Sequence, residues 1–563
     1  MFKKIANHIS RYKGTSPYMK WLWGYTKPYI PILLAFMGIT TLSSGITVYT
    51  AVLGKNIIDS ATKSKPFMSY IFLYIGIIIF VQIMSVVTSL ITVIVFERFS
   101  FGIRKQVYEK ILASTYQRVS AYHTGDLMTR LTTDCGSIAE GISNIIPSII
   151  KLILEFSITF VVLFQYDPIL ALCAVLIAPV GAIMSFWLGK KLKPLQIKVI
   201  ESEARYRSFI QESLANLLII KTFCNEKYST DRLTQLRDER MYWVIKKNKM
   251  SQIASSSIGL AFQGGYMLAF AWGATKLSLN KITYGTMSVF LTLVNRIQSP
   301  IIGLTTTVPK VINILASAGR VMELQSLPEE KRLEQTIAPQ NIGLSVDALT
   351  FGYSDELLLE NANLQISPGE FVAIIGESGI GKTTLIRLIL AFITPQSGII
   401  QFYNNQGEAV NTSGSARSFM SYVPQGNTLF SGTISSNVRM GKTDATDEEI
   451  INALIASSAY DFVKDLPNGI ETVIGERGFG ISEGQAQRIA IARALIKSAS
   501  FLVLDEATSS LDEKTELSVL QGLRDVSPRP TCMLITHRRS VLDYCDREIL
   551  IEDKKLVSRE LIH

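Results

Sequence analysis

The sequence predicts two domains of different fold class. An all-α membrane domain of six spanning helices is followed by an α/β domain with a phosphate-binding loop. Long uncharged apolar runs fill the first half of the 563-residue chain. After about residue 340, short apolar strands alternate with helices and turns, a pattern typical of an α/β domain. A mean hydropathy of +0.26 with 18% charged residues indicates a chain that is part membrane and part aqueous.

Six membrane spans are predicted from the positions of the charged residues. A hydrocarbon core about 30 Å thick needs roughly 20 residues of helix. Four runs reach this length with no charge inside them: 27–55, 65–97, 167–190 and 249–276. Two further runs, about 142–166 and about 284–318, contain charged residues and complete the six.

Lysine and arginine predict which side of the membrane the long connections occupy. An even number of spans places both termini on one side. Segments 1–27, 97–141 and 190–250 are rich in Lys and Arg, and such an excess marks the cytoplasmic side. These segments account for the net charge of +9. The sequence has no basic stripe interleaved with aromatic residues, so it does not indicate a nucleic-acid partner.

The expected domain boundaries follow from the spans. The membrane domain is predicted over residues 1–325 and the α/β domain over 340–563. At the start, the aromatic residues around Trp21 and Trp23 suit a short helix at the membrane interface, although an ordinary flanking segment fits nearly as well. The long segments 97–141 and 190–250 are predicted to be helical extensions with a bend. They could carry force between the domains; solvated hairpins are the alternative.

Polar residues inside the predicted spans suggest a substrate path. Charges within a membrane are costly and usually face a cavity or a partner. Glu155 and Arg296 lie at similar predicted depth, and Asn295 and Gln298 flank the arginine. One hypothesis is that these four residues line a polar pocket for the transported substance. The other is that Glu155 and Arg296 neutralise each other between helices.

A phosphate-binding loop follows the apolar run 371–375, which is predicted to be a buried strand. The loop consists of Gly376, Glu377, Ser378, Gly379, Ile380, Gly381, Lys382 and Thr383, with Thr384 opening the following helix. Glycines let the backbone N–H groups face the phosphates, and the helix start adds its positive dipole end. Lys382 would reach the β- and γ-phosphates, and Thr383 would bind Mg²⁺.

A second strand ends in two carboxylates. The apolar run 501–504 is followed by Asp505 and Glu506. An aspartate beside a phosphate-binding loop suits magnesium coordination. Glu506 is placed to polarise an attacking water as a general base.

Nearly the whole chain resembles the ABC exporters. Ser482-Glu483-Gly484-Gln485 opens a helix that continues with Gln487-Arg488-Ile489-Ala490-Ile491-Ala492-Arg493-Ala494, and this looks like the ABC signature motif. The rest of the set is the aromatic loop at Phe351-Gly352-Tyr353, the Q-loop at Tyr422-Val423-Pro424-Gln425, the D-loop at Ser510-Leu511-Asp512 and the switch histidine at Thr536-His537. Residues 472–478 resemble the exporter loop that contacts the coupling helices, and six spans before one ATPase domain match a half-size exporter.

The resemblance implies a role for each motif. Tyr353 would stack on adenine, Gln425 would sense Mg²⁺ and the membrane domain, and His537 would hold the γ-phosphate. Ser482, Gly484 and Gln485 would act on ATP bound to the other subunit. The resemblance therefore implies a dimer with two ATP sites and with ATP and Mg²⁺ as cofactors.

One residue departs from the family pattern. Glu483 stands where the signature motif usually has glycine. A carboxylate there could slow closure by repelling the γ-phosphate, or it could point outward at a helix N-terminus, which favours acids. We expect an active homodimer, and a heterodimer with a sister half-transporter remains the alternative.

The predicted mechanism is ATP-driven alternating access. The expected substrate is amphipathic: a drug, a lipid or a hydrophobic peptide. The expected location is a bacterial inner membrane, with the ATPase domain and both termini in the cytoplasm. The rival functions are an ATP-gated conduit or regulatory subunit without pumping, and an importer subunit, which the fused layout disfavours.

Overall fold

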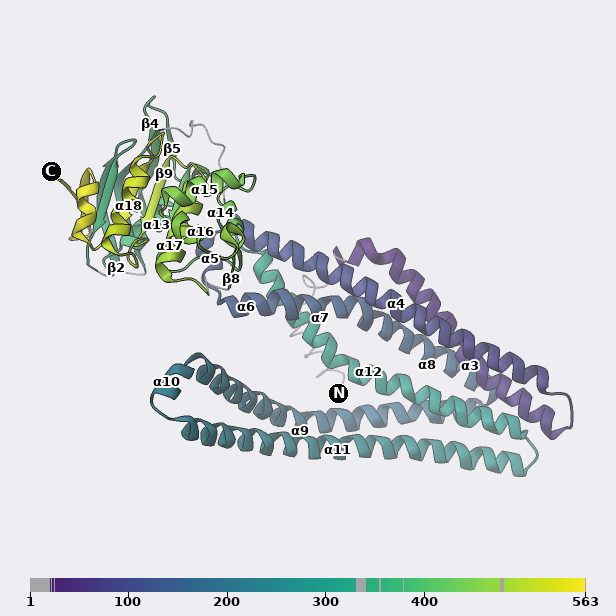
Figure 1. Cartoon of the computed structure of the whole chain (residues 1–563). Helices are drawn as coiled ribbons and strands as arrows, with labels where there is room; N and C mark the ends of the chain where they lie inside the picture. The colour runs from purple at the N-terminus through teal and green to yellow at the C-terminus, as the bar shows by residue number, and fades with distance from the viewer. Residues whose placement is uncertain are drawn as a thin grey trace. The chain divides into compact units, whose positions relative to one another are not determined.

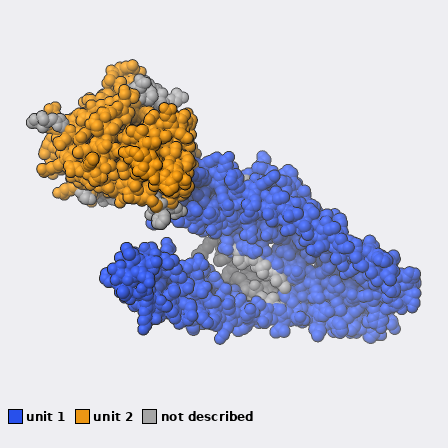
Figure 2. Space-filling view, viewed as in Figure 1, with its two compact units in different colours: residues 1–111, 123–326 blue, residues 112–122, 327–563 orange. Residues whose placement is uncertain are grey.

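The computed structural model describes residues 21, 23–24, 26–330, 341–353, 356–377, 379–475 and 480–561. These residues form two compact units, which Figure 2 colours separately. Unit 1 consists of residues 1–111 and 123–326. Unit 2 consists of residues 327–563 together with 112–122, a short piece taken from the first long connection of the membrane domain. Each unit is described by itself.

Unit 1 is entirely helical in the part that the structure describes. Its elements are η1 (Lys27–Tyr29), α3 (Ile30–Thr62), α4 (Met68–Ala113), α6 (Thr124–Thr129), η2 (Arg130–Asp134), α7 (Cys135–Glu140), η3 (Gly141–Ile145), α8 (Ile146–Tyr166), α9 (Pro168–Ala215), α10 (Leu217–Thr222), α11 (Glu226–Ser278) and α12 (Tyr284–Gln325). Each predicted span falls largely within one of these helical stretches. Three stretches, 27–62, 68–113 and 124–166, are long and apolar enough to cross a membrane by length and composition, within the residues described.

The second long connection is a helical hairpin. Helices α9 and α11 run side by side (Figure 1) and continue far beyond the apolar runs, with the short α10 between their ends. At the end of the hairpin away from α10, Asp167 joins the two long helices. It caps the start of α9 and also accepts hydrogen bonds from Trp272 and Lys276, near the end of α11. Residues 190–250 are therefore continuous helix apart from the turns around α10.

A buried charge cluster ties the start of the third helical stretch to the end of α12. The Asp134 side chain, whose residue is 1% exposed, accepts hydrogen bonds from Arg320 and Ser317. Arg130 is paired with both Asp126 and Glu323. The bond to Asp134 raises the pKa of Arg320. Because α12 leads into the chain that enters unit 2, these pairs fix the base of that helix.

Unit 2 contains two main β-sheets. One has the order β2-β1-β4-β5 and is antiparallel: β1 (Ile342–Tyr353), β2 (Glu356–Ile366), β4 (Ser397–Asn404) and β5 (Ala409–Asn411). The other has the order β12-β11-β3-β10-β9-β6: β3 (Phe371–Ile375), β6 (Met420–Val423), β9 (Phe501–Asp505), β10 (Thr531–Ile535), β11 (Arg547–Glu552) and β12 (Lys555–Glu560). All its pairings are parallel except that of β12.

Short helices and one small strand pair complete unit 2. They are α5 (Tyr116–Val119), α13 (Lys382–Ile389), η4 (Gly414–Ser418), β7 (Gly432–Thr433), α14 (Ile434–Arg439), α15 (Asp447–Ala456), α16 (Tyr460–Lys464), η5 (Gly469–Glu471), β8 (Val473–Ile474), α17 (Glu483–Leu495), α18 (Glu513–Arg524) and η7 (Arg539–Tyr544). This is the α/β fold that the second half of the sequence predicts.

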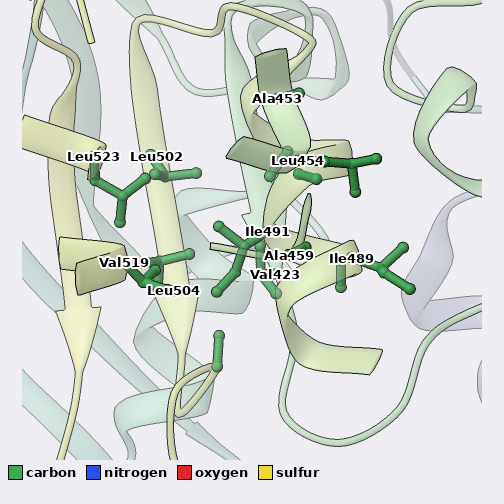
Figure 3. Packing of buried hydrophobic residues seen from close by; sticks show 14 of the residues in the cluster. Val423, Ala453, Leu454, Ala459, Ile489, Ile491, Leu502, Leu504, Val519 and Leu523 are labelled. Atoms are coloured by element: carbon green, nitrogen blue, oxygen red, sulfur yellow. The ribbon is translucent and has the colours of Figure 1, made fainter. Parts of the chain in front are cut away.

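The parallel sheet is buried on both faces, which explains its continuous apolar strands. Along β9, Leu502 and Leu504 point toward Val519 and Leu523 of α18 (Figure 3). Phe501 and Val503 belong to the opposite core, with α13. The carboxyl ends of parallel strands share one edge of a sheet, so the residues that follow β3, β6, β9 and β10 are brought together there.

Candidate functional site

The loop after β3 has the backbone geometry of a phosphate cradle. Gly379 and Gly381 have φ angles of +87° and +117°, in the left-handed region that favours glycine. Helix α13 begins at Lys382, immediately after them. The N–H groups of the loop and of the first helical turn can therefore face an anion. Ser378 lies outside the described residues.

Lys382 is folded over its own loop. The residue is 7% exposed, and its Nζ donates to the carbonyls of Gly376 at 2.5 Å and Glu377 at 3.1 Å. Burial lowers the pKa of Lys382, an effect that the nearby carboxylates of Glu506 and Asp505 oppose. A phosphate placed in the loop would give this ammonium a stronger partner than two carbonyls.

Glu506 lies at the centre of the site. It has a φ of +50°, and its own N–H is bound to the carbonyl of Ile535. Its Oε2 accepts from Gln425 Nε2 at 2.6 Å, and its Oε1 lies 3.1 Å from His537 Nε2. The same His537 nitrogen is 3.3 Å from Lys382 Nζ. Residues from four separate motifs therefore meet within hydrogen-bond distance.

Asp505 is the buried carboxylate of the site. It is 4% exposed and accepts a hydrogen bond from the Tyr422 hydroxyl at 3.1 Å. Burial raises the pKa of Asp505, and the neighbouring Glu506 adds to this. Two adjacent carboxylates, one of them buried, favour a cation beside them.

The residues present fit a magnesium ion bound with a nucleotide. Mg²⁺ prefers oxygen ligands and is usually held by one or two protein groups together with substrate phosphates. Asp505 offers a carboxylate, Thr383 an exposed hydroxyl and Gln425 an exposed amide oxygen. Thr384, by contrast, is buried in α13.

The signature segment forms a capped helix start. Ser482 Oγ accepts from the Gln485 N–H, and Gln485 Oε1 accepts from the Ser482 N–H, so each satisfies the other. A Cβ on Gly484 would lie 2.9 Å from the carbonyl oxygen of Ser510, so only glycine allows this approach. The side-chain hydrogen bonds of Ser482 and Gln485, in the part of the chain described, stay within this cap.

The signature helix is joined to the D-loop within the same chain. Gln487 Oε1 accepts from the Ser510 N–H, and its Nε2 donates to the hydroxyls of Ser509 and Ser510. Arg538 donates to the carbonyls of Ser509 and Leu511. The D-loop is thereby held between the signature helix and Arg538.

Two interactions in the site were missed by sequence reasoning. Tyr422 belongs to the Q-loop pattern in the sequence, but its bond to Asp505 depends on β6 and β9 being neighbours in the sheet. Arg538 also pairs with Glu516, which is 0% exposed, through Nη1 and Oε2 at 2.9 Å. Arg538 and Glu516 are 22 positions apart in the sequence, and no local pattern indicates that two charged residues at that separation form a pair.

The aromatic residue predicted to meet the base is accessible. Tyr353 ends β1 and is 46% exposed, and its ring contacts that of the buried Phe351 edge-on at 5.1 Å. In the exporter-type loop, Thr472 and Gly475 flank β8, whereas Glu476, Arg477 and Gly478 lie outside the described residues.

The polar residues of the predicted substrate path divide into two groups. Arg296 Nη2 donates to Thr50 Oγ1 of α3 at 3.3 Å, and Glu155 lies within electrostatic range of the guanidinium. Asn295 is exposed in this single chain. Gln298 is buried, and its Nε2 donates to the Phe262 carbonyl of α11 at 3.3 Å. Gln298 thus joins two helices, whereas Arg296 and Glu155 form a local polar group.

Comparison with known proteins matches both halves of the chain. Residues 30–301 match the family model described as "ABC transporter transmembrane region", and residues 359–509 match "ABC transporter". An ATP-dependent lipid A-core flippase of Desulfotalea psychrophila is 31% identical over 94% of each chain. A putative multidrug export ATP-binding/permease protein of Staphylococcus aureus is 27% identical over 96% of each chain. A solved bacterial Atm1-family ABC exporter with ATP bound has the same fold, with a TM-score of 0.80, 22% identity and 94% coverage of both chains.

Proposed function

The chain belongs to the ABC transporter family as a half-size exporter that moves its substrate across a membrane with the energy of ATP, and we propose which residues carry out that function. The observation that supports the assignment best is the position of Glu506. Its two carboxylate oxygens lie beside Gln425 and His537, at the end of β9 and close to Lys382. Such a carboxylate is well placed to accept a proton from a water that attacks the γ-phosphate.

ATP is bound by the phosphate loop and by Tyr353. The N–H groups of the loop and of the first turn of α13 would receive the phosphates, and Lys382 would turn from the carbonyls of its own loop to the β- and γ-phosphates. His537 would then donate a hydrogen bond to the γ-phosphate and would no longer contact Glu506. Mg²⁺, when bound by Thr383, Gln425 and Asp505, supplies positive charge to the phosphate oxygens.

Two copies of the chain form the working unit. One chain carries one phosphate loop and one signature segment, so a second copy is needed to place Ser482, Gly484 and Gln485 against each ATP. Glu483 is compatible with this arrangement, because it is exposed at the first position of α17, where an acidic residue favours the helix. A sister chain that supplies a different signature segment is the alternative.

The transported substance is an amphipathic molecule with an anionic group, and an anionic lipid is the first candidate. Arg296 is only half-buried and donates to the Thr50 hydroxyl, while Glu155 acts on it through electrostatics, so its guanidinium keeps donors for a ligand. A charged donor within a membrane strongly favours a negatively charged partner. The flippase of Desulfotalea psychrophila, which acts on lipid A-core, supports a lipid substrate.

We expect Arg296→Ala to impair transport of anionic lipids selectively. Loss of a hydrogen bond to a charged group lowers affinity roughly 10-fold or more. ATP-driven flipping of fluorescent phosphatidylglycerol in proteoliposomes should fall, while flipping of the zwitterionic phosphatidylcholine changes little. Lys310→Ala, which removes an exposed cation from the same helix, is the matched control. Equal flipping of phosphatidylglycerol by both variants would remove Arg296 from the substrate path.

The chain is an integral membrane protein. We place it in a bacterial inner membrane, with unit 2 and both termini in the cytoplasm, because the basic segments 1–27, 97–141 and 190–250 favour that orientation. The orientation also places the ATP site where cytoplasmic ATP can reach it.

A further inference from the structure

Tyr422 lies beside Asp505, the aspartate proposed to bind Mg²⁺, on a neighbouring strand of the sheet. It lies on β6, and its neighbours Ser421 and Val423 are buried on the opposite face. Its ring packs against the core that contains α13 and Phe392. Strand β6 pairs in parallel with β9, with Tyr422 opposite Val503. This register places the hydroxyl 3.1 Å from Asp505 Oδ2, at the end of the neighbouring strand.

The piece of unit 2 that comes from the membrane domain's first long connection reaches the same core through Tyr116. Residues 113–115 pair with 328–330 through two backbone hydrogen bonds, from Thr115 N–H to the Pro328 carbonyl and from Glu330 N–H to the Ala113 carbonyl. The next residue, Tyr116, places its ring 4.7 Å from that of Phe392. Tyr422 and Phe392, the ring that Tyr116 contacts, therefore pack against the same hydrophobic core.

We propose that Tyr422 is a positioning residue, which orients Asp505 for Mg²⁺ and links that carboxylate to the docked segment 112–122. A hydroxyl donates one hydrogen bond, so it fixes one carboxylate oxygen and leaves the other for the metal or a metal-bound water. Partners of this kind orient metal ligands. A shift of Tyr116 against Phe392 moves the surroundings of the phenol and hence the carboxylate. The inference rests on the proposed role of Asp505 in metal binding.

The test measures how much Mg²⁺ tightens nucleotide binding. Affinity for the non-hydrolysable analogue AMP-PNP is determined on the full chain in lipid discs, first with EDTA and then with saturating Mg²⁺. Tyr422→Phe keeps the ring and removes the hydroxyl. We expect the affinity in EDTA to be unchanged and the tightening by Mg²⁺ to fall roughly 10-fold, as for other partners of metal ligands.

Tyr403→Phe is the matched control. Its hydroxyl donates to the Ile366 carbonyl at 3.0 Å, in the antiparallel sheet, so the same atom is lost without any effect on Asp505. We expect the full Mg²⁺ effect in this variant. If Tyr422→Phe keeps the full effect as well, the inference is overturned.

Asp505→Asn separates the inference from its premise. If this variant loses the Mg²⁺ effect while Tyr422→Phe keeps it, only the role of Tyr422 is wrong. If Asp505→Asn keeps the effect too, the metal assignment itself fails, and the inference fails with it.

A double-mutant cycle tests the link to segment 112–122. We expect Tyr116→Leu to reduce the Mg²⁺ effect in the unmodified chain and to have no further effect once Tyr422 is Phe. Additive losses would show that Tyr116 acts by another route, and the link through Tyr422 would be withdrawn.

Discussion

Replacing Glu506 with glutamine should abolish ATP hydrolysis while leaving ATP binding nearly intact. The amide preserves the shape of the side chain and its contact with Gln425, but it cannot accept a proton from water. A positioned general base contributes about 100- to 10,000-fold to a rate, so turnover should fall by that amount. Phosphate release and ATP affinity, measured on the same protein in lipid discs, give the two quantities.

Glu513→Gln is the matched control for this change. Glu513 is exposed in the first turn of α18 and belongs to the same domain, so its replacement removes the same charge away from the site. Turnover should stay near that of the unmodified chain. If Glu506→Gln kept most of the activity, the base would have to be another group, and the role of Glu506 would be lost.

Among the single replacements considered, Arg538→Ala should lower the stability of the chain against thermal unfolding the most. Arg538 neutralises Glu516, a fully buried carboxylate, and also holds the carbonyls of Ser509 and Leu511. The Arg538 side chain is 40% exposed, so the cost lies in leaving the buried Glu516 charge without its partner, which is about 3–5 kcal/mol. For a domain of this size the unfolding midpoint should therefore fall by about 10 °C. Thermal unfolding of the full chain in lipid discs measures this, and the freed D-loop should also lower ATP turnover.

Two further variants isolate the cause of that loss. Arg539→Ala removes the neighbouring arginine, which is exposed, and should leave the midpoint unchanged. The double change Arg538→Met with Glu516→Leu removes both charges and fills their space, so it should recover most of the stability. A double variant as unstable as Arg538→Ala would mean that the carbonyl contacts, and not the buried charge, dominate.

The fold was predictable where the sequence pattern reflects burial directly. Uncharged runs of twenty or more residues mark helices that can cross a membrane, and the apolar strands before Gly376 and Asp505 mark a sheet covered on both faces. The assignment of segment 112–122 to unit 2 was not predictable, because its contacts, such as those with residues 328–330 and Phe392, join distant parts of the chain. Residues so far apart in sequence have no shared local pattern.

The site was predictable to the level of its motifs but not of its hydrogen bonds. Lys382, Gln425, Glu506 and His537 were expected to serve one reaction, and the structure brings them within hydrogen-bond distance. The strand order that places Tyr422 beside Asp505 is a property of the whole sheet. For Arg296, helix packing adds the contact with Thr50, which no spacing in the sequence indicates.

ATP hydrolysis by this chain alone, purified into lipid discs, is the most direct test of the central claim that two identical copies form a complete transporter. We predict steady hydrolysis that anionic lipid stimulates and that Glu506→Gln removes, with Glu483 tolerated in both signature segments. A folded chain that binds ATP but does not hydrolyse it would contradict the claim, because the site would then need a sister chain or would serve a function other than pumping.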